Sequence, residues 1–116
     1  MNSYRKRPIN KYHNTKVIYD GIKFDSKREC NYYKKLKLLE RVGEITDLQR
    51  QVPFCLQPSY KFKGKKVRAI MYIADFVYVD KNKDFHVVDV KGFRTDGYKI
   101  KKKMFEYLFN KEIEEI

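Results

Sequence analysis

Two mainly apolar stretches flank a short polar segment. The stretches are residues 70–79 and 85–91, and every residue of the intervening segment 80–84 is polar or charged. Short apolar runs bounded by turn residues are typical of β-strands, and a polar segment between two such strands is typical of a turn. We therefore predict an antiparallel hairpin that is symmetric about Asn82.

Each strand of this hairpin carries one acid among apolar residues, Asp75 in the first and Asp89 in the second. Symmetry about Asn82 places the two directly opposite each other, with Cβ atoms about 4.5–5.5 Å apart. A buried carboxylate is costly unless it is paired or binds a metal, so two opposed carboxylates require a proton or a cation between them. Lys91 lies two residues beyond Asp89 and shares its face. A loop of even length would instead separate the two acids.

The chain before the hairpin predicts a short hairpin, a helix and a strand. Residues 17–19 and 22–24 flank an Asp-Gly turn. A helix is expected from Ser26 to about Arg41, with Gly43 as its C-terminal cap. A connector at 44–47 leads to a strand at 48–56 that Pro53 is expected to interrupt. A further turn around Gly64 leads into the strand at 70–79.

A second helix is expected over residues 98–110, after a polar loop at 93–97. Ile100, Met104, Tyr107 and Leu108 recur at helical spacing and predict its apolar face. We expect the acidic tail at 112–116 to continue this helix. The predicted order is helix, three or more strands, helix.

A length of 116 residues predicts one domain, which we assign to residues 17–116, preceded by a basic and flexible arm at residues 1–16. The net charge of +12 favours a polyanionic partner, with nucleic acid the commonest and an anionic membrane the alternative. No apolar run approaches the roughly 20 residues that span a bilayer, and no secretory signal is evident. Cys30 and Cys55 lack metal-site spacing and are expected to be free, buried thiols.

A third acid, Glu29, lies on the first helix. It shares a helix face with Tyr33 and Leu36, so we expect it to contact the sheet. The pattern Ser26-x-x-Glu29 also matches a capping box, in which the glutamate bonds back to the start of the helix. Taken with the two opposed aspartates, Glu29 becomes a candidate third carboxylate of one site.

Three carboxylates and a lysine suit the hydrolysis of a phosphodiester. Carboxylate oxygens are preferred ligands of Mg²⁺, which also retains waters and binds phosphate oxygens. The ion activates a water and steadies the leaving oxygen. A nearby lysine stabilises negative charge in the transition state.

These residues resemble the PD-(D/E)xK nuclease superfamily over roughly residues 24–108. Three segments, 24–29, 73–76 and 88–92, are similar to a family of small phage and prophage proteins, formerly of unknown function, assigned to that superfamily and suspected of acting as Holliday-junction resolvases. Two positions depart from the pattern. Ala74 stands where the superfamily name has proline, and Asp89 replaces the more frequent glutamate.

The resemblance implies an α/β fold with a restriction-endonuclease-like core, a mixed β-sheet flanked by helices in the order α-β-β-β-α. It also implies Mg²⁺, with Mn²⁺ as a substitute, held by Asp75, Asp89 and the backbone carbonyl of Val90. Glu29 would be the outer carboxylate and Lys91 the catalytic lysine.

Basic residues outside the motif are candidate DNA contacts. The candidates are Arg5, Lys6 and Arg7 of the arm, and Arg94, Lys99, Lys102 and Lys103 at the second helix. For the helix residues, an ordinary solvated face is the alternative. Gln51 is a candidate neighbour of the site from the preceding strand.

The leading hypothesis is a Mg²⁺-dependent endodeoxyribonuclease that cuts branched recombination intermediates and acts as a homodimer, since two strands must be cut symmetrically. The branch preference follows only from the resemblance, as does a phage or prophage setting in the cytoplasm of a bacterial host. The alternatives are a sequence-specific homing or restriction-like endonuclease, and a non-catalytic DNA-binding module on a nuclease fold.

Overall fold

The computed structural model describes residues 16–90 and 94–116. The chain divides into two compact units, one ending at Lys35 and the other running from Leu36 to Ile116. Each unit is described separately below, and the division into an arm and a single domain stays a prediction. The arm residues Arg5, Lys6 and Arg7 and the candidate catalytic Lys91 lie outside the described residues.

The first unit contains the predicted short hairpin and most of the predicted helix. Strands β1 (Val17–Tyr19) and β2 (Ile22–Phe24) pair antiparallel. The turn residues Asp20 and Gly21 both have positive φ, at 56° and 73°, as a two-residue type I′ turn requires. Helix α1 (Lys27–Arg41) follows, and the hydroxyl of Ser26 accepts a hydrogen bond from the Glu29 backbone N–H at 3.1 Å. Ser26 therefore caps this helix.

The end of α1 confirms the predicted glycine cap. Gly43 has a φ of 83°. Its N–H donates to the Glu40 carbonyl at 3.1 Å, and the Glu44 N–H donates to the Leu39 carbonyl at 2.9 Å. These two bonds form a Schellman motif, which needs a residue in the left-handed region and therefore favours glycine.

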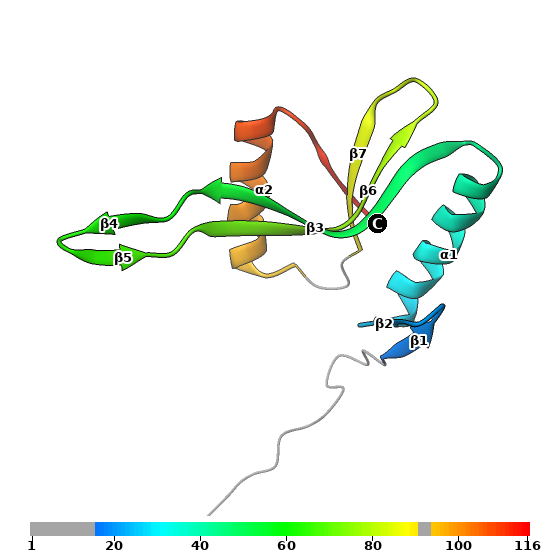
Figure 1. The fold of residues 1–116 in the computed structure, drawn as a ribbon, viewed down its shortest axis with the longest axis horizontal. Helices are drawn as coiled ribbons and strands as arrows, with labels where there is room; N and C mark the ends of the chain where they lie inside the picture. Colours follow the sequence, from blue (N-terminus) through cyan, green and yellow to red (C-terminus); the bar gives the residue numbers. More distant parts are fainter. Residues whose placement is uncertain (1–15, 91–93) are drawn as a thin grey trace, which may run out of the picture. The chain divides into compact units, whose positions relative to one another are not determined.

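The second unit is built on a four-stranded mixed sheet (Figure 1). The strands lie in the order β3 (Ile45–Gln57), β6 (Ile70–Asp80), β7 (Phe85–Asp89) and β8 (Ile113–Glu115). The first three are antiparallel to their neighbours, and β8 is parallel to β7. The predicted mixed α/β architecture is thus confirmed in outline, with one strand more than the minimum expected.

Pro53 does not interrupt its strand, contrary to the prediction. β3 is continuous from Ile45, and Pro53 pairs with Ile73 of β6. Because β3 is the edge strand of this sheet, the missing N–H of proline can face away from the neighbouring strand. The predicted connector at 44–47 is also largely part of β3, which accommodates Asp47 at a positive φ of 55° next to a shift in register.

The predicted symmetry of the β6–β7 hairpin is confirmed. Val79 pairs with Phe85 and Phe76 with Val88, a register centred on Asn82. Asp80 closes the turn, since its carboxylate accepts hydrogen bonds from the backbone N–H groups of Asn82 at 2.8 Å and of Asp84 at 3.1 Å. The odd loop length, which the placement of the two acids required, is therefore observed.

The acidic tail does not continue the second helix. Helix α2 (Asp96–Phe109) ends at Asn110, whose φ is 51° and whose N–H donates to the Glu106 carbonyl at 2.9 Å. The chain then forms β8, which pairs with β7 so that Glu115 lies beside Asp89. A left-handed cap residue stops the helix, and the open edge of β7 offers backbone partners to the tail.

The core of the second unit lies between the sheet and α2. Leu56, Ala74, Val87 and Ile113 belong to it. Aromatic rings fill the centre: the ring centroid of Phe105 lies 5.0 Å from that of Phe54 and 5.6 Å from that of Tyr72. Burial of large aromatic side chains is a major source of stability in so small a unit.

Of the four residues in the apolar face predicted for α2, only Met104 packs against the core. Ile100 is 59% exposed, Tyr107 87% and Leu108 49%, whereas Phe105 is fully buried and Tyr98 is 8% exposed. The helix therefore turns a different stripe toward the sheet. The predicted stripe and the buried one are both apolar, so periodicity could not separate them; packing against β3 and β6 selects the aromatic pair.

Two further expectations concern the cysteines and membrane segments. Cys30 and Cys55 are both free, as predicted, but Cys55 is exposed rather than buried, while Cys30 is 2% exposed. Cys55 lies on the edge strand β3, where alternate side chains face outward. Neither helix within the described ranges combines the length and apolar character needed to cross a membrane.

His86 connects three strands through its ring nitrogens. Nε2 lies 2.7 Å from the carboxylate of Asp80 at the end of β6, and Nδ1 contacts the carboxylate of Glu114 on β8. Burial alone would lower the pKa of His86, but its hydrogen bonds with Asp80 and Glu114 outweigh burial and raise the pKa above the ordinary 6.5. The folded protein therefore binds this proton more tightly than the unfolded chain does.

The free energy of unfolding is accordingly expected to fall as pH rises above the ordinary histidine pKa of 6.5. The contribution of His86 is fully present below that value and is lost as pH passes through the raised folded-state pKa. Urea unfolding across this window measures it. His86→Gln is expected to flatten the dependence, and His13→Gln, which changes the other histidine, to leave it unchanged; equal slopes in both variants would contradict the assignment.

Candidate functional site

Asp75 and Asp89 lie where the β6–β7 ladder ends. The last pair of that ladder is Phe76 with Val88, and the next position in the same register joins Asp75 with Asp89. β7 continues there beside β8, where Asp89 pairs with Glu115. The two acids thus occupy the point at which β7 exchanges one partner strand for another.

The carboxylate of Asp75 is held by groups from both neighbouring strands. Oδ2 accepts a hydrogen bond from the backbone N–H of Val90 at 2.8 Å. Oδ1 lies 3.4 Å from the side-chain amide of Gln51 on β3. The side chain of Asp75 therefore reaches the residue next to Asp89, and the structure brings the candidate neighbour Gln51 to it.

Gln51 also has an unusual backbone conformation. Its φ is 52°, in the left-handed region that residues other than glycine rarely adopt. Such conformations persist only where surrounding structure imposes them, and they are concentrated at functional sites. The strained residue of β3 and the first aspartate are thus in contact.

Asp89 is fully buried and accepts a hydrogen bond from an aromatic hydroxyl. Its relative exposure is 0%, and the Tyr72 hydroxyl donates to Oδ2 at 2.6 Å. Burial, and secondarily the bond to Asp89, raise the pKa of Tyr72 well above its ordinary value. Tyr72 is therefore a permanent hydrogen-bond donor that orients one oxygen of the carboxylate.

A second polar group lies beside Asp89 on the adjacent strand. The Tyr98 hydroxyl donates to Glu115 at 2.8 Å, and Arg94 forms an ion pair with the same carboxylate at 3.1 Å. The hydrogen bond from Tyr98 and the interaction with Arg94 lower the pKa of Glu115. Glu115 is thereby kept ionised next to the buried Asp89.

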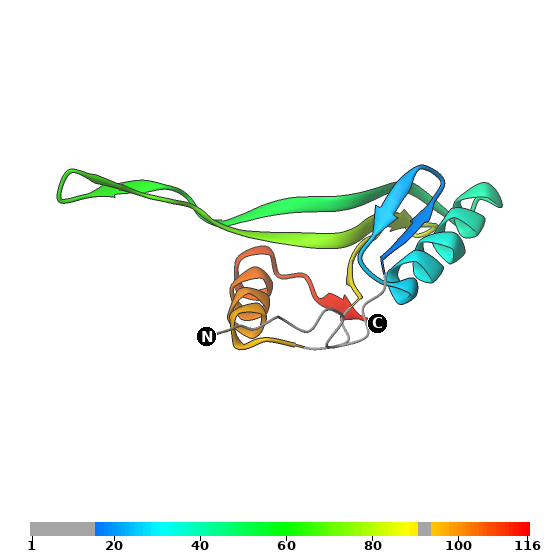
Figure 2. The same cartoon turned by 90° about the horizontal axis from the view of Figure 1, so that it is seen from below.

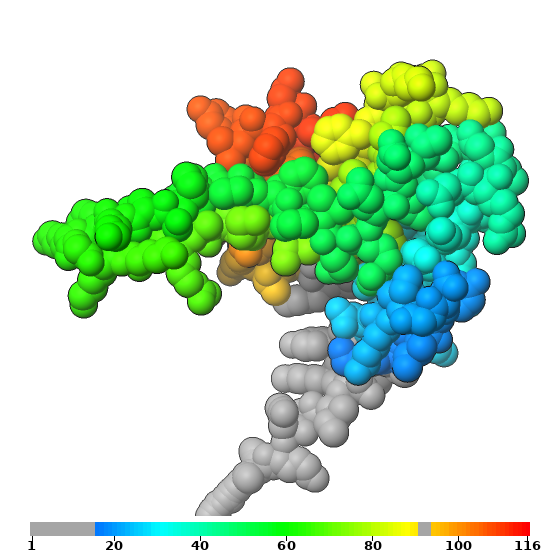
Figure 3. Space-filling view, viewed as in Figure 1, coloured from blue at the N-terminus to red at the C-terminus, as the bar shows by residue number. Residues whose placement is uncertain are grey.

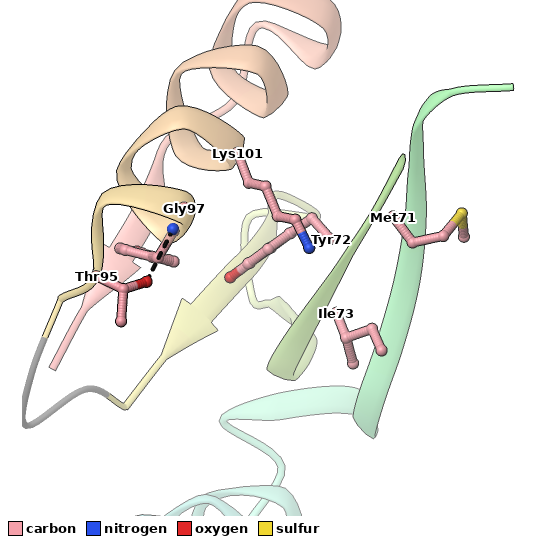
Figure 4. A pocket seen from close by; sticks show the side chains of 7 residues that line it. Met71, Tyr72, Ile73, Thr95, Gly97 and Lys101 are labelled. Carbon is pink, nitrogen blue, oxygen red and sulfur yellow. Dashed lines mark hydrogen bonds between the residues drawn. The ribbon is translucent and has the colours of Figure 1, made fainter. Parts of the chain in front are cut away.

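An open pocket of about 350 Å³ adjoins this network between β6 and α2 (Figure 4). Tyr72 and Tyr98 contribute to its wall, and Lys101 extends from α2 toward β6. The remaining lining residues are Met71, Ile73, Thr95 and Gly97. The pocket is thus lined by the cationic side chain of Lys101 and by two tyrosine rings, one of which, Tyr72, bonds Asp89.

The candidate DNA contacts of α2 differ in their availability. Arg94 is paired with Glu115, and Lys102 forms an ion pair with Glu106 at 2.9 Å. Lys99 and Lys103 are exposed. The structure thus leaves Lys99 and Lys103 as the better candidates for phosphate contacts, because the charges of the other two are partly neutralised by neighbouring carboxylates.

Two predicted site residues, Glu29 and Lys91, are not described together with the two aspartates. Glu29 is 6% exposed but belongs to the first unit, while Asp75 and Asp89 belong to the second. Lys91 lies outside the described residues. Among the residues that are described, no group of three or more His, Cys, Asp or Glu side chains is arranged as a metal site. The set of three carboxylates and a lysine therefore stays a prediction.

The chemistry of the pair nevertheless fits Mg²⁺. The ion commonly takes one or two protein carboxylates and keeps several waters. Asp75 in the middle of β6 and Asp89 at the end of β7 supply two carboxylates, and Val90 follows Asp89 directly with its backbone carbonyl. This donor set consists entirely of oxygen and suits a hard cation rather than zinc.

Sequence reasoning missed three residues of this region. These residues are Tyr72, Tyr98 and Lys101. Tyr98, Lys101 and the buried Phe105 follow at spacings of three and four, which place them on one helix face. That spacing was a usable signal, but it competed with the equally periodic stripe that includes Ile100.

Comparisons with known proteins give a family and no function. A family model described as "Protein of unknown function (DUF1064)" matches residues 9–115. Nothing among curated proteins matches the chain, and nothing among solved structures does.

Proposed function

We propose that this chain, which belongs to the DUF1064 family, is a Mg²⁺-dependent endodeoxyribonuclease with a PD-(D/E)xK site and a restriction-endonuclease-like core. The proposed substrate is branched DNA of the Holliday-junction type, cut by a homodimer in the cytoplasm of a bacterial host that carries a phage or prophage. The alternatives are a sequence-specific homing or restriction-like endonuclease and a DNA-binding module without activity.

The observation that carries the proposal is the register of the β6–β7 hairpin. It brings the second strand to Asp75 so that Val90 bonds the carboxylate at 2.8 Å. Asp89 is fully buried beside it. Retaining two acids at such a position costs stability unless a cation or proton offsets their repulsion. The net charge of +12 supports a polyanionic substrate.

In the proposed mechanism the chain's own residues hold and orient the metal ligands. Asp75 and Asp89 would hold Mg²⁺ together with the Val90 carbonyl. Tyr72 fixes one oxygen of Asp89, and the Val90 N–H fixes one oxygen of Asp75. When bound, Mg²⁺ supplies polarisation of the phosphate and a lowered pKa for an attacking water. Lys91 is proposed to stabilise the negative charge that develops on the phosphate, and Glu29 to act as the outer carboxylate.

Cleavage of a four-way DNA junction in Mg²⁺, and none in EDTA, is the expected result for the purified protein. A linear duplex of the same sequence is the control for branch preference, and its cleavage should be slower. Mn²⁺ should restore activity after EDTA treatment. Products are separated on a denaturing gel, and symmetric nicks in opposed strands would indicate a dimer.

Two outcomes of this assay would replace the proposal. Metal-independent binding without any cleavage would favour the non-catalytic DNA-binding module. Cutting of a linear duplex at one defined sequence, with indifference to junctions, would favour the homing or restriction-like enzyme. Affinity for DNA at low salt decides nothing, because the net charge of +12 predicts it for either case.

Tyr72→Phe is expected to weaken Mg²⁺ binding and cleavage by about 10- to 100-fold, the usual cost of removing a group that orients a metal ligand. The variant keeps the ring and loses only the hydroxyl that bonds Asp89. Activity is measured against Mg²⁺ concentration, where a positioning role shifts the half-saturating concentration upward. Tyr78→Phe is the matched control on the same strand, and an equal loss in both variants would argue for a general effect on β6.

A further inference from the structure

A two-stranded extension of the sheet carries a strong charge that the proposed site does not use. Strands β4 (Tyr60–Phe62) and β5 (Lys65–Val67) pair antiparallel between β3 and β6. Lys63 and Gly64 form the turn, with φ values of 50° and 79°. In Figures 1 and 2 this hairpin continues the line of β3 and β6 and extends beyond α2. We call residues 58–69 the β-arm.

The charged residues of the β-arm are all basic. It contains no acid and five cationic residues, all exposed: Lys61, Lys63, Lys65, Lys66 and Arg68. None of these five forms an ion pair with a carboxylate of the described residues, in contrast to Arg94 and Lys102 of α2. In Figure 3 the green atoms of the β-arm stand out beyond the orange and red atoms of α2.

The two faces of the β-arm differ in character. Lys61 pairs directly with Lys66, so their side chains share one face, which Arg68 continues two residues further along. Tyr60 and Phe62 occupy the other face and are 47% and 60% exposed. One face of the ribbon is therefore cationic, and the other carries the two aromatic rings together with Lys65, which pairs with Phe62.

This arrangement is unfavourable for an isolated hairpin. Like charges directly opposite each other destabilise an antiparallel pair, and a two-stranded hairpin with little support is only marginally stable in water. A polyanion laid along the cationic face removes the repulsion between Lys61 and Lys66 and adds favourable contacts. The charge pattern thus fits a ligand with closely spaced phosphates.

We propose that the β-arm binds the phosphate backbone of duplex DNA, with the face formed by Lys61, Lys66 and Arg68 turned toward the phosphates. A two-stranded β-ribbon has the width that the major groove admits. Basic side chains supply affinity without sequence information, which suits a contact that positions DNA.

The reach of the β-arm places this contact about one helical turn from the acids. Lys66 precedes Asp75 by nine residues in nearly continuous extended chain, which span at most about 30 Å at 3.3 Å per residue. One turn of B-DNA is about 34 Å. The position of the scissile phosphate rests on the proposed function, whereas the contact between the β-arm and DNA does not.

The test compares two triple variants that remove the same charge. One is Lys61→Gln, Lys66→Gln and Arg68→Gln in the β-arm; the other is Lys23→Gln, Lys27→Gln and Lys83→Gln, all exposed and outside it. Affinity for a duplex of about two helical turns is measured in EDTA between about 50 and 200 mM salt. Three phosphate contacts predict that the slope of log K against log salt falls by nearly 3 in the β-arm variant, at about 0.9 per contact, and by less than 1 in the control.

A duplex shorter than about one turn adds a second readout. The wild-type protein is expected to bind this short duplex more weakly than the long one. The β-arm variant is expected to bind the two duplexes with nearly equal affinity. Equal slopes in the two triple variants, with both proteins folded by circular dichroism, would overturn the proposal. Loss of binding to phosphatidylserine vesicles by the β-arm variant, with DNA affinity unchanged, would overturn it in favour of a membrane contact.

The assay separates this proposal from the nuclease proposal, because binding in EDTA requires no cleavage. If the wild-type protein never cuts DNA but the β-arm variant shows the expected fall in salt dependence, the nuclease proposal is refuted and the β-arm proposal is supported. A β-arm variant that binds and cuts as wild type does refutes the arm and leaves the nuclease standing.

Discussion

Asp89→Asn is expected to abolish DNA cleavage while leaving the fold and the affinity for DNA in EDTA intact. The substitution keeps the size of the side chain and an oxygen that can accept the bond from Tyr72, but it removes the negative charge that is proposed to bind the metal. A catalytic metal contributes several kcal/mol to the transition state, so the rate should fall by about 1,000-fold or more at 1.36 kcal/mol per factor of ten. The measurement is single-turnover cleavage of a four-way junction in Mg²⁺.

Asp84→Asn is the matched control, because Asp84 is an exposed acid in the turn of the same hairpin. It changes the net charge equally and is expected to retain the wild-type rate. If Asp89→Asn melts at the wild-type temperature and still cleaves at the wild-type rate, Asp89 is not a metal ligand. The proposed mechanism would then be wrong.

Phe105→Ala is expected to destabilise the protein by about 3–5 kcal/mol, the usual cost of truncating a fully buried phenylalanine. Phe105 has no exposed surface and packs against Phe54, Tyr72 and Phe109. Domains of this size are stable by only about 5–15 kcal/mol, so the loss is a large share of the total. Urea unfolding should show a lower midpoint with little change in slope.

Tyr107→Ala tests the orientation of α2 by the same urea-unfolding measurement. Tyr107 is two residues away on the same helix and is 87% exposed, so its truncation is expected to change stability by about 0.5 kcal/mol or less. The alternative orientation, with Ile100 and Tyr107 toward the sheet, predicts the reverse order of effects. A larger loss for Tyr107→Ala than for Phe105→Ala would therefore show that the helix face is wrongly assigned.

The features that sequence alone predicted well depend on neighbouring residues. The turn at Asp20-Gly21 and the caps at Ser26 and Gly43 each follow from a side chain or a backbone angle within a few positions. The register of the β6–β7 hairpin belongs with them, because loop length sets the pairing of two adjacent strands. The position of Asp75 and Asp89 directly beyond the last pair of this ladder was for this reason predictable before any tertiary structure.

The features that sequence missed depend on contacts between distant segments. Pro53 is tolerated because β3 lies at the edge of the sheet. The sequence of β3 does not indicate that it is an edge strand. The acidic tail forms β8 because the free edge of β7 is available to it. Tyr72 belongs to the candidate site only because folding brings its hydroxyl to Asp89, 17 residues further along the chain.

Local rules of turn length and helix capping thus determined the short hairpin, the limits of the first helix and the register of the β6–β7 hairpin, because their energies arise within a few residues of chain. Tertiary structure decided which apolar stripe of α2 is buried, where the tail pairs, and which hydroxyl orients Asp89. These features depend on packing and strand pairing between segments that are far apart in the sequence. No local sequence pattern therefore predicts them.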